Sequence, residues 1–377
     1  MKSKYFITIV LYFFYLTSFS QHKDTIYGKV KTIREKVEFL TQKENPQLLY
    51  YDDYGHSGFM GPESTISRFK NIWFSTQFCY YINYERHFNI KGKVIEDIWF
   101  TKKDSFMTSY KYKYDKKERL IRKTDSLDGL VYTDTHYYEN DNHENIISQN
   151  SDLDYFNHKY KRYNKDKKLI RLKSFDDYGT IDEYIYKYNS EGKLLYRIYK
   201  NPNSWRKSGE RSWSYGVQDS IGNIYKDLVN EYDNSNRLIK TQQFDLYEDD
   251  ETHKEPKLTR STIYNYNNDN LTQIINSYSN GKPTYTNYVY DNKNRLIEKY
   301  CCSEKKSDSK RIEKYVYKKD EVISLEYKEE SFPTKEIKTY KVSYDYKYDN
   351  KGNWKEILKK VNGIELYRWI REIEYYE

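Results

Sequence analysis

The sequence predicts an all-β protein of tandem antiparallel β-hairpins that form an extended, curved or shell-like sheet. The 377-residue chain contains no alanine, the best helix former, and 46 tyrosines, which favour strands. Only 37% of the residues are hydrophobic, but each tyrosine ring can bury about 150–250 Å², so the chain can form a core instead of staying disordered. The third observation is an internal repeat of about 24 residues.

The first twenty residues are typical of an export signal. Two lysines precede an uncharged apolar and aromatic run over residues 5–16, and small residues follow. The pattern predicts cleavage between Ser20 and Gln21, and no cysteine lies there to carry a lipid anchor. Twelve apolar residues are short of the roughly 20 that cross a bilayer. We therefore expect a secreted or periplasmic protein with no membrane span after cleavage.

Residues 21–80 differ from the repeats and are expected to form a β region that caps one end of the array. Residues 26–40 suit a long first strand, although their apolar spacing would also suit a helix. Glycines around Gly58 and Gly61 predict a loop, and the aromatic stretch 72–81 predicts a strand.

The repeat array is expected over residues 81–377. In each clear copy a tyrosine, called here the anchor tyrosine, is followed by Asp or Asn, and an apolar residue comes six positions after it. Looser copies surround Tyr84, Tyr138, Tyr266 and Tyr317, which gives about ten units. The six clear copies are YKYDKKERLI (112–121), KRYNKDKKLI (161–170), YKYNSEGKLL (186–195), NEYDNSNRLI (230–239), YVYDNKNRLI (288–297) and YKYDNKGNWK (346–355).

Turn chemistry explains the copies. If Asp115 faces Arg119, three residues remain for the loop, and such loops combine a type I turn with a left-handed residue and a bulge. Asp or Asn suits the first turn position because its side chain bonds the backbone that follows. The turn residues predicted in this way are Asp115, Asn164, Asn189, Asp233, Asp291 and Asp349, with Gly192 and Gly352 among those at the left-handed position.

Shorter return turns are predicted at three dipeptides with hairpin composition, at 128–129, 280–281 and 362–363. Two strands of about eight residues plus two turns then account for the period. One hairpin alone is marginal, so the units must stabilise one another.

These copies resemble the YD repeats, also called RHS repeats, of secreted bacterial proteins. The tail, with Trp354 after the last turn and REIEYY over residues 371–376, is similar to the ending of small exported members. The resemblance implies a curved or shell-like sheet of hairpins, which in large relatives encloses a toxin domain or displays binding modules. This chain lacks the large relatives' core motif and has only about twenty residues after its last repeat, so the resemblance transfers no catalytic residues.

Functional residues of repeat proteins tend to lie in insertions. The insertion at about 197–228 carries the candidate ligand-binding residues Trp205, Arg206, Trp213 and Tyr215, an aromatic and basic group suited to a sugar or a peptide. The alternative is a degenerate hairpin with buried tryptophans. A second, acidic insertion over 247–255 lacks the spacing of a calcium loop and is expected to be a solvated tip.

No catalytic or cofactor motif is present in the sequence, and we expect neither metal nor cofactor. His136 and His143, which flank a looser copy, are expected to be solvated. The three cysteines leave open whether Cys79 pairs with Cys301 or Cys302, which as neighbours would point to opposite faces of a strand.

The charge and motif patterns favour one function class and leave two open. The formal net charge of +8 is spread in alternating sign, which argues against nucleic acid as a partner. The sequence favours an exported, non-enzymatic protein that binds a glycan or a protein at the cell envelope or outside the cell. The alternatives are an envelope scaffold or shielding partner for another protein and a hydrolase of polysaccharide or peptide.

Overall fold

The described part of the chain forms 22 strands and one α-helix. A computed structural model describes residues 26–41, 58–127, 129–152, 155–177, 181–201, 223–245, 255–279, 281–331 and 334–377. The expected signal peptide therefore lies outside the described residues. The strands are β1 (Val30–Phe39), β2 (Asn83–Phe88), β3 (Val94–Phe100), β4 (Phe106–Tyr114), β5 (Leu120–Leu127), β6 (Leu130–Asn140), β7 (His143–Asn150), β8 (Phe156–Tyr163), β9 (Leu169–Asp176), β10 (Ile181–Tyr188), β11 (Leu194–Asn201), β12 (Asn223–Tyr232), β13 (Leu238–Asp245), β14 (Lys257–Asn267), β15 (Asn270–Tyr278), β16 (Thr284–Tyr290), β17 (Leu296–Cys301), β18 (Arg311–Lys318), β19 (Glu321–Glu330), β20 (Ile337–Tyr348), β21 (Trp354–Val361) and β22 (Ile364–Tyr375).

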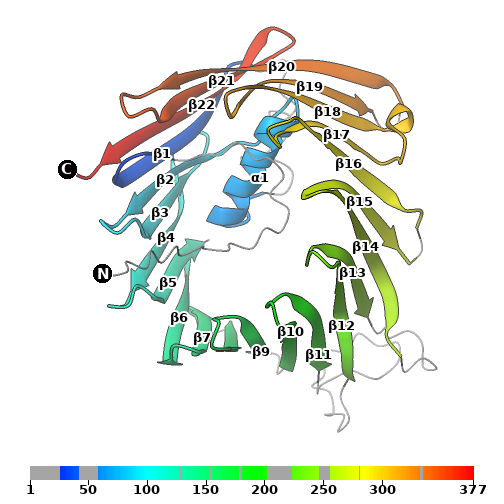
Figure 1. The fold of residues 1–377 in the computed structure, drawn as a ribbon. Helices are drawn as coiled ribbons and strands as arrows, with labels where there is room; N and C mark the ends of the chain where they lie inside the picture. The colour runs from blue at the N-terminus through cyan, green and yellow to red at the C-terminus, as the bar shows by residue number, and fades with distance from the viewer. Residues whose placement is uncertain are drawn as a thin grey trace, which may run out of the picture.

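The strands close into a barrel. From β2 to β22 each strand pairs antiparallel with the next along the chain, as the sequence predicts for tandem hairpins. The first strand, β1, then pairs on one side with β22 and on the other with β2 (Figure 1). The predicted all-β architecture of antiparallel hairpins is confirmed, but the sheet that was expected to be extended, curved or shell-like closes into a barrel. Closure satisfies the backbone groups that two edge strands would leave unpaired.

The six predicted turns have the expected geometry. The amide of Asp115 donates to the carbonyl of Arg119 at 2.9 Å, and the amide of Glu118 donates back to Asp115 at 2.9 Å. The Asp115 carboxylate also accepts from the amides of Lys117 and Arg119. In all six turns the fourth residue is left-handed, with φ of 62° at Glu118, 59° at Lys167, 77° at Gly192, 60° at Asn236, 60° at Asn294 and 84° at Gly352.

Two further turns of this type were not predicted. Asn89 and Thr101 each occupy the first turn position, and Gly92 and Asp104 have the positive φ. Of the return turns, Asn362 and Gly363 both have positive φ, as a two-residue hairpin turn requires. Asp128 and Asn280 lie outside the described residues.

Tyrosine hydroxyls connect successive hairpins. In eight hairpins a repeat tyrosine donates its hydroxyl to a backbone carbonyl of the preceding hairpin. The carbonyl lies in the first or second residue of that hairpin's second strand. Each bond therefore joins one hairpin to the previous one, in addition to the strand ladder. The pairs are Tyr114 to Val94, Tyr138 to Leu120, Tyr188 to Leu169, Tyr232 to Leu194, Tyr266 to Leu238, Tyr290 to Leu271, Tyr317 to Leu296 and Tyr346 to Val322.

The described part of the stretch 21–80 contains one strand and one helix. Its residues 30–39 form β1, as predicted, but α1 (Pro62–Ser75) replaces part of the strand expected over 72–81, and residues 76–82 have no strand. Pro62 suits the first helical turn, and Ile66, Phe69 and Trp73 are buried at helical spacing. α1 lies inside the ring of strands (Figure 1).

The helix packs against the inner face of the barrel near the closing seam. Phe69 and Trp73 contact the ring of Trp369 with centroids 4.8 and 5.5 Å apart. Trp369 in turn contacts Trp354 at 4.4 Å. The main hydrophobic cluster accordingly draws on α1, β1–β4 and β19–β22 rather than on the whole ring.

Both faces of the barrel carry ion pairs, and the aromatic cluster lies on the inner face. Tyr346 and Trp369 both lie opposite Ile357 on β21 and therefore share the inner face, which also holds the Glu35–Arg371 ion pair. The outer face carries ion pairs between adjacent strands, including Lys314–Glu326 at 2.6 Å and Lys347–Glu356 at 2.8 Å. Across the described residues, no helix has the length and apolar character needed to span a membrane.

Candidate functional site

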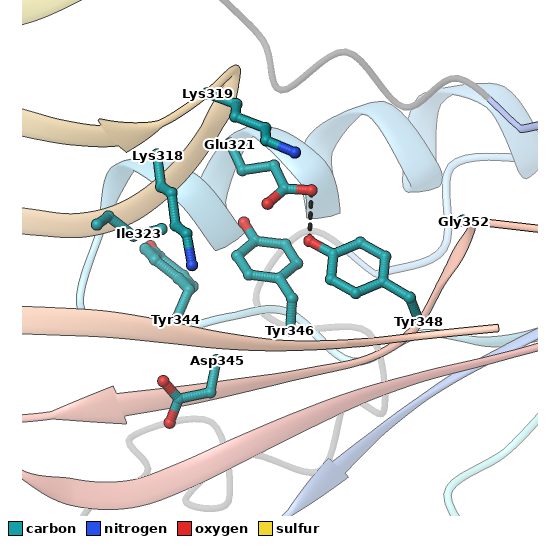
Figure 2. A pocket seen from close by; sticks show the side chains of 9 residues that line it. All are labelled: Lys318, Lys319, Glu321, Ile323, Tyr344, Asp345, Tyr346, Tyr348 and Gly352. Atoms are coloured by element: carbon teal, nitrogen blue, oxygen red, sulfur yellow. Dashed lines mark hydrogen bonds between the residues drawn. The ribbon is translucent and has the colours of Figure 1, made fainter. Parts of the chain in front are cut away.

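A pocket of about 760 Å³ lies where β20 approaches the turn between β18 and β19. Figure 2 shows it with α1 behind, so the pocket faces the interior of the barrel. Its lining combines aromatic, basic and acidic side chains. The lining residues are Lys318, Lys319, Glu321, Ile323, Tyr344, Asp345, Tyr346, Tyr348 and Gly352.

Three tyrosines at alternate positions of β20 form the aromatic wall, because alternate residues of a strand share one face. Tyr344 is 3% exposed and donates its hydroxyl to the carbonyl of Trp73 at 2.8 Å, so it forms the floor against α1. Tyr346 donates to the carbonyl of Val322 at 2.9 Å. Burial is the main cause that raises the pKa of Tyr344 well above its usual value, so this ring is neutral at physiological pH.

Tyr348 is the accessible member of the wall, with 40% of its surface exposed. Its ring lies nearly parallel to that of Tyr346, with centroids 6.2 Å apart and an interplanar angle of 16°. The hydroxyl of Tyr348 donates to the carboxylate of Glu321 (Figure 2). Burial, followed by this hydrogen bond, raises the pKa of Tyr348. The carboxylate therefore fixes the ring in place.

The charged groups divide between the two sides of β20. The side chains of Lys318 and Lys319 extend toward the tyrosines from the β18–β19 turn (Figure 2). Asp345 projects from the opposite side of β20 and pairs with Lys360 on the outer face at 3.1 Å. The pocket thus presents one carboxylate, two ammonium groups and an exposed aromatic face.

A second pocket, of about 610 Å³, occupies the equivalent place in another unit. In both pockets the anchor tyrosine, Tyr232 or Tyr348, lies beside the left-handed turn residue, Asn236 or Gly352. The position of Tyr346 is taken there by Asn230, which donates to the carbonyl of Leu194 at 2.9 Å. The second pocket therefore lacks the paired rings.

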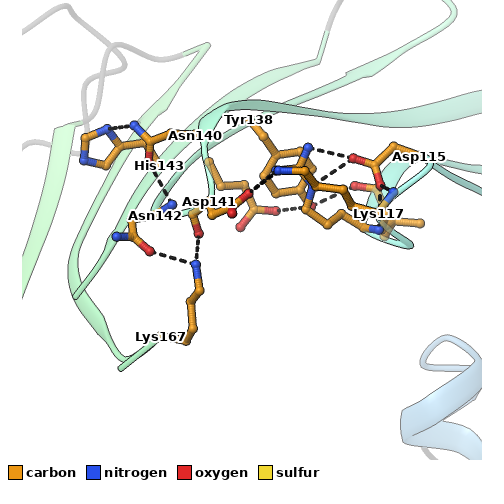
Figure 3. A network of polar contacts seen from close by, with 11 residues as sticks. Asp115, Lys117, Tyr138, Asn140, Asp141, Asn142, His143 and Lys167 are labelled. Carbon is orange, nitrogen blue, oxygen red and sulfur yellow. Dashed lines mark hydrogen bonds and ion pairs between the residues drawn. The ribbon is translucent and has the colours of Figure 1, made fainter. Parts of the chain in front are cut away.

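Polar contacts link neighbouring turns along the rim of the barrel (Figure 3). The carboxylate of Asp141 accepts from Lys117 at 3.0 Å and from Arg119 at 3.1 Å, and Lys167 donates to its carbonyl at 2.7 Å. The hydrogen bond from Lys117 is the main cause that lowers the pKa of Asp141. These charges compensate one another, so the network ties turns together and offers no open site.

The central part of the insertion predicted to bind ligand, residues 202–222, lies outside the described residues. Trp205, Arg206, Trp213 and Tyr215 lie outside the described residues, as do residues 247–254 of the acidic insertion. The flanking strands β11 and β12 pair directly, from Tyr196–Val229 to Asn201–Asn223. The described ends of the insertion, residues 197–201 and 223–228, therefore belong to two adjacent strands.

His136 is not solvated, contrary to expectation. Its side chain is 11% exposed, and Nδ1 lies 2.8 Å from Glu144 Oε1. Tyr163 also donates to Glu144 at 2.8 Å. Burial raises the pKa of Glu144, but the hydrogen bonds from His136 and Tyr163 outweigh burial and bring that pKa to about 2. Within the described ranges no group of three His, Cys, Asp or Glu side chains is placed to hold a metal ion.

Sequence reasoning missed the β20 pocket. The tyrosines at 344, 346 and 348 were visible as part of a repeat, and alternate spacing alone predicts a shared face. The same pair of tyrosines two residues apart occurs in other copies, at Tyr186 and Tyr188 and at Tyr288 and Tyr290, so the repeat alone did not single out this unit.

Comparison with known proteins leaves the family unassigned. No family model matches the chain, and no curated protein matches it. Similar solved structures include the Tc holotoxin pore of Photorhabdus luminescens, at 12% identity, 76% coverage of this chain and a TM-score of 0.27. This chain spans only 19% of the length of the matched toxin-pore chain. A porin-like protein from Bacteroides uniformis is similar at 10% identity and a TM-score of 0.27. The match covers 92% of this chain and 98% of the porin-like chain. Likenesses this distant support no argument about function.

Proposed function

We propose that this protein is an exported, non-enzymatic member of the YD-repeat proteins that binds a glycan segment in the β20 pocket. The observation that carries the proposal is the exposed ring of Tyr348, held parallel to Tyr346 and hydrogen-bonded to Glu321. A sugar ring has an apolar C–H face and a hydroxyl edge. The tyrosine rings match the face, and Glu321 with Lys318 and Lys319 match the edge.

Membership of the YD-repeat proteins and export are part of the same proposal. The six turns with their Asp or Asn, together with the tyrosine bonds between units, support the first. The amino-terminal composition supports the second.

The arrangement of carboxylates supports binding rather than hydrolysis. Glycoside hydrolysis usually needs two carboxyl groups that flank one bond, about 5–5.5 or 6.5–9.5 Å apart on the same site. Glu321 faces the tyrosines, whereas Asp345 projects from the other side of β20. The two carboxylates that line this pocket therefore cannot flank one sugar.

A glycan array followed by titration calorimetry tests the proposal. The exported chain, residues 21–377, should bind a defined glycan class. Tyr348→Ala should weaken that binding about tenfold or more, which corresponds to a loss of about 1.4 kcal/mol in binding free energy. Tyr137→Ala is the matched control, since Tyr137 is 53% exposed on the outer face of β6. Equal binding by the parent and Tyr348→Ala would contradict the pocket. Loss in Trp205→Ala/Trp213→Ala alone would assign binding to the insertion.

Closure of the barrel favours a second candidate, a shielding partner for another protein. A closed wall can surround a segment of a client, and the pairing of β1 with both β22 and β2 provides that closure. A client recovered from the envelope by cross-linking should then resist protease only in the presence of this protein. A client cleaved equally fast in both conditions would reject shielding.

A further inference from the structure

Two adjacent cysteines lie in an unusual geometry at the end of β17. Cys301 is the last residue of the strand, and Cys302 follows with φ of 77°. The amide of Cys302 donates to the carbonyl of Tyr285 at 2.8 Å, which holds this backbone in place. The two Sγ atoms are 2.9 Å apart.

The positive φ explains why the sulfurs meet. Neighbouring residues of a regular strand point to opposite faces, which is why adjacent cysteines were not expected to interact. The left-handed turn at Cys302 interrupts this alternation and directs its side chain back toward Cys301.

This conformation is uncommon for the residue type. Left-handed backbone favours Gly, Asn and Asp and costs other residues about 1–2 kcal/mol. The other non-glycine positive-φ residues of the described chain are Asp, Asn, Glu or Lys, all at hairpin turns or connections. A cysteine held in this conformation beside a second cysteine indicates that the pair has a role of its own.

The surroundings give the two thiols different access. Cys302 is exposed, whereas Cys301 is partly buried on the inner face opposite Arg311. Burial, with the hydrogen bond to Cys302, raises the pKa of Cys301 to about 12. Cys302 is therefore the thiol that meets an oxidant first. Cys79 is fully buried in the core and is remote from solvent.

We propose that Cys301 and Cys302 form a reversible vicinal disulfide when the protein meets a small-molecule disulfide such as oxidised glutathione. The Cys302 thiolate, after losing its proton to water, attacks one sulfur of the oxidant and releases a glutathione thiolate. Cys301 then attacks Cys302 Sγ in the mixed disulfide, and its proton goes to the second glutathione that leaves. The two cysteines lose two electrons, and one oxidised glutathione becomes two reduced molecules.

The bridge should be easy to reverse. Adjacent Cα atoms are about 3.8 Å apart, below the usual range of about 4.4–6.8 Å for disulfides, and bridges outside that range are more easily reduced. The pair would therefore respond to the redox state of the compartment. This site is independent of the β20 pocket, so either proposal can fail alone.

Thiol counting tests the proposal. After treatment with oxidised glutathione, denaturation and alkylation, one thiol (Cys79) should be labelled instead of three, and the intact mass should fall by two hydrogens. Dithiothreitol should restore three. In Cys79→Ser the same treatment should leave no thiol, and in Cys302→Ser two should remain labelled.

Peptide mapping fixes the position of the bond. A fragment that contains residues 301 and 302 should carry the loss of two hydrogens within one peptide. Three labelled thiols after oxidation, a stable glutathione adduct on Cys302, or dimers linked through Cys302 would each overturn the proposal.

Discussion

Glu35 on β1 and Arg371 on β22 form a buried ion pair that joins the two ends of the chain. Arg371 Nη2 lies 2.6 Å from Glu35 Oε1, with side chains only 1% and 2% exposed. The guanidinium also stacks on the ring of Trp354 at 3.6 Å. A second ion pair, Lys31–Glu374, links the same two strands but is exposed to solvent.

Breaking the buried pair should destabilise the barrel strongly. Glu35→Ala leaves Arg371 buried without its carboxylate and removes the acceptor of Trp369 Nε1 at 3.2 Å. We expect a loss of about 3–5 kcal/mol in the free energy of unfolding, measured by urea titration. Glu374→Gln, which breaks the exposed pair between the same strands, should leave the midpoint almost unchanged. Equal effects of the two variants would contradict a special role for the buried pair.

The tyrosine hydroxyls should each contribute a measurable increment to stability. Tyr290→Phe removes only the oxygen that donates to the Leu271 carbonyl at 3.0 Å. The expected cost is about 0.5–1.5 kcal/mol, because the ring still packs. Tyr137→Phe, at an exposed outer position, serves as the control and should change nothing. An unfolding midpoint for Tyr290→Phe equal to that of the parent would show that the strand ladder alone joins the units.

The left-handed turn position should discriminate between residue types. Gly352 has φ of 84°, and a Cβ there would meet no atom within 4 Å, so the effect of substitution is purely conformational. Gly352→Ala should cost about 1–2 kcal/mol, whereas Gly352→Asn should cost less because asparagine tolerates this region. Thermal unfolding of both variants measures the difference, and the reverse order would contradict the assigned turn.

Stability should fall in acid through Glu144. Its pKa in the folded chain is about 2, below the ordinary value of 4.5. The unfolded chain therefore takes up a proton first, so the contribution of Glu144 is complete above about pH 4.5 and is lost as the pH falls toward 2. Urea unfolding between pH 6 and pH 2.5 should show a shallower pH dependence in Glu144→Gln than in the parent. Parallel curves would reject the assignment.

The turns were predictable from sequence because their causes are local. Asp115 and its counterparts bond amides two and four residues ahead, so five residues contain the whole interaction. The bulged pairing of Tyr114 with Leu120 follows from loop length for the same reason.

Closure and the helix depended on information beyond the repeat. The Glu35–Arg371 pair joins residues far apart in sequence, and no local pattern shows that β1 meets both β2 and β22. In α1 two sequence signals conflict. The aromatic residues Trp73 and Phe74 favour a strand, whereas the spacing of Ile66, Phe69 and Trp73 favours a helix. Packing of Phe69 against Trp369 stabilises the helix. The tandem order of hairpins places β20 beside β19, but it does not show which units leave open space between their side chains.

The bond from each repeat tyrosine to the preceding unit has a consequence for how such a chain can change size. Eight hairpins present the same tyrosine donor to the preceding unit, whereas Tyr163 of the β8–β9 hairpin donates to Glu144 instead. A hairpin within a run of such units can therefore be duplicated or deleted without removing the partner of the tyrosines that remain. The circumference of the wall is then variable, whereas the contacts of β1 with β22 and β2 must be retained at every size.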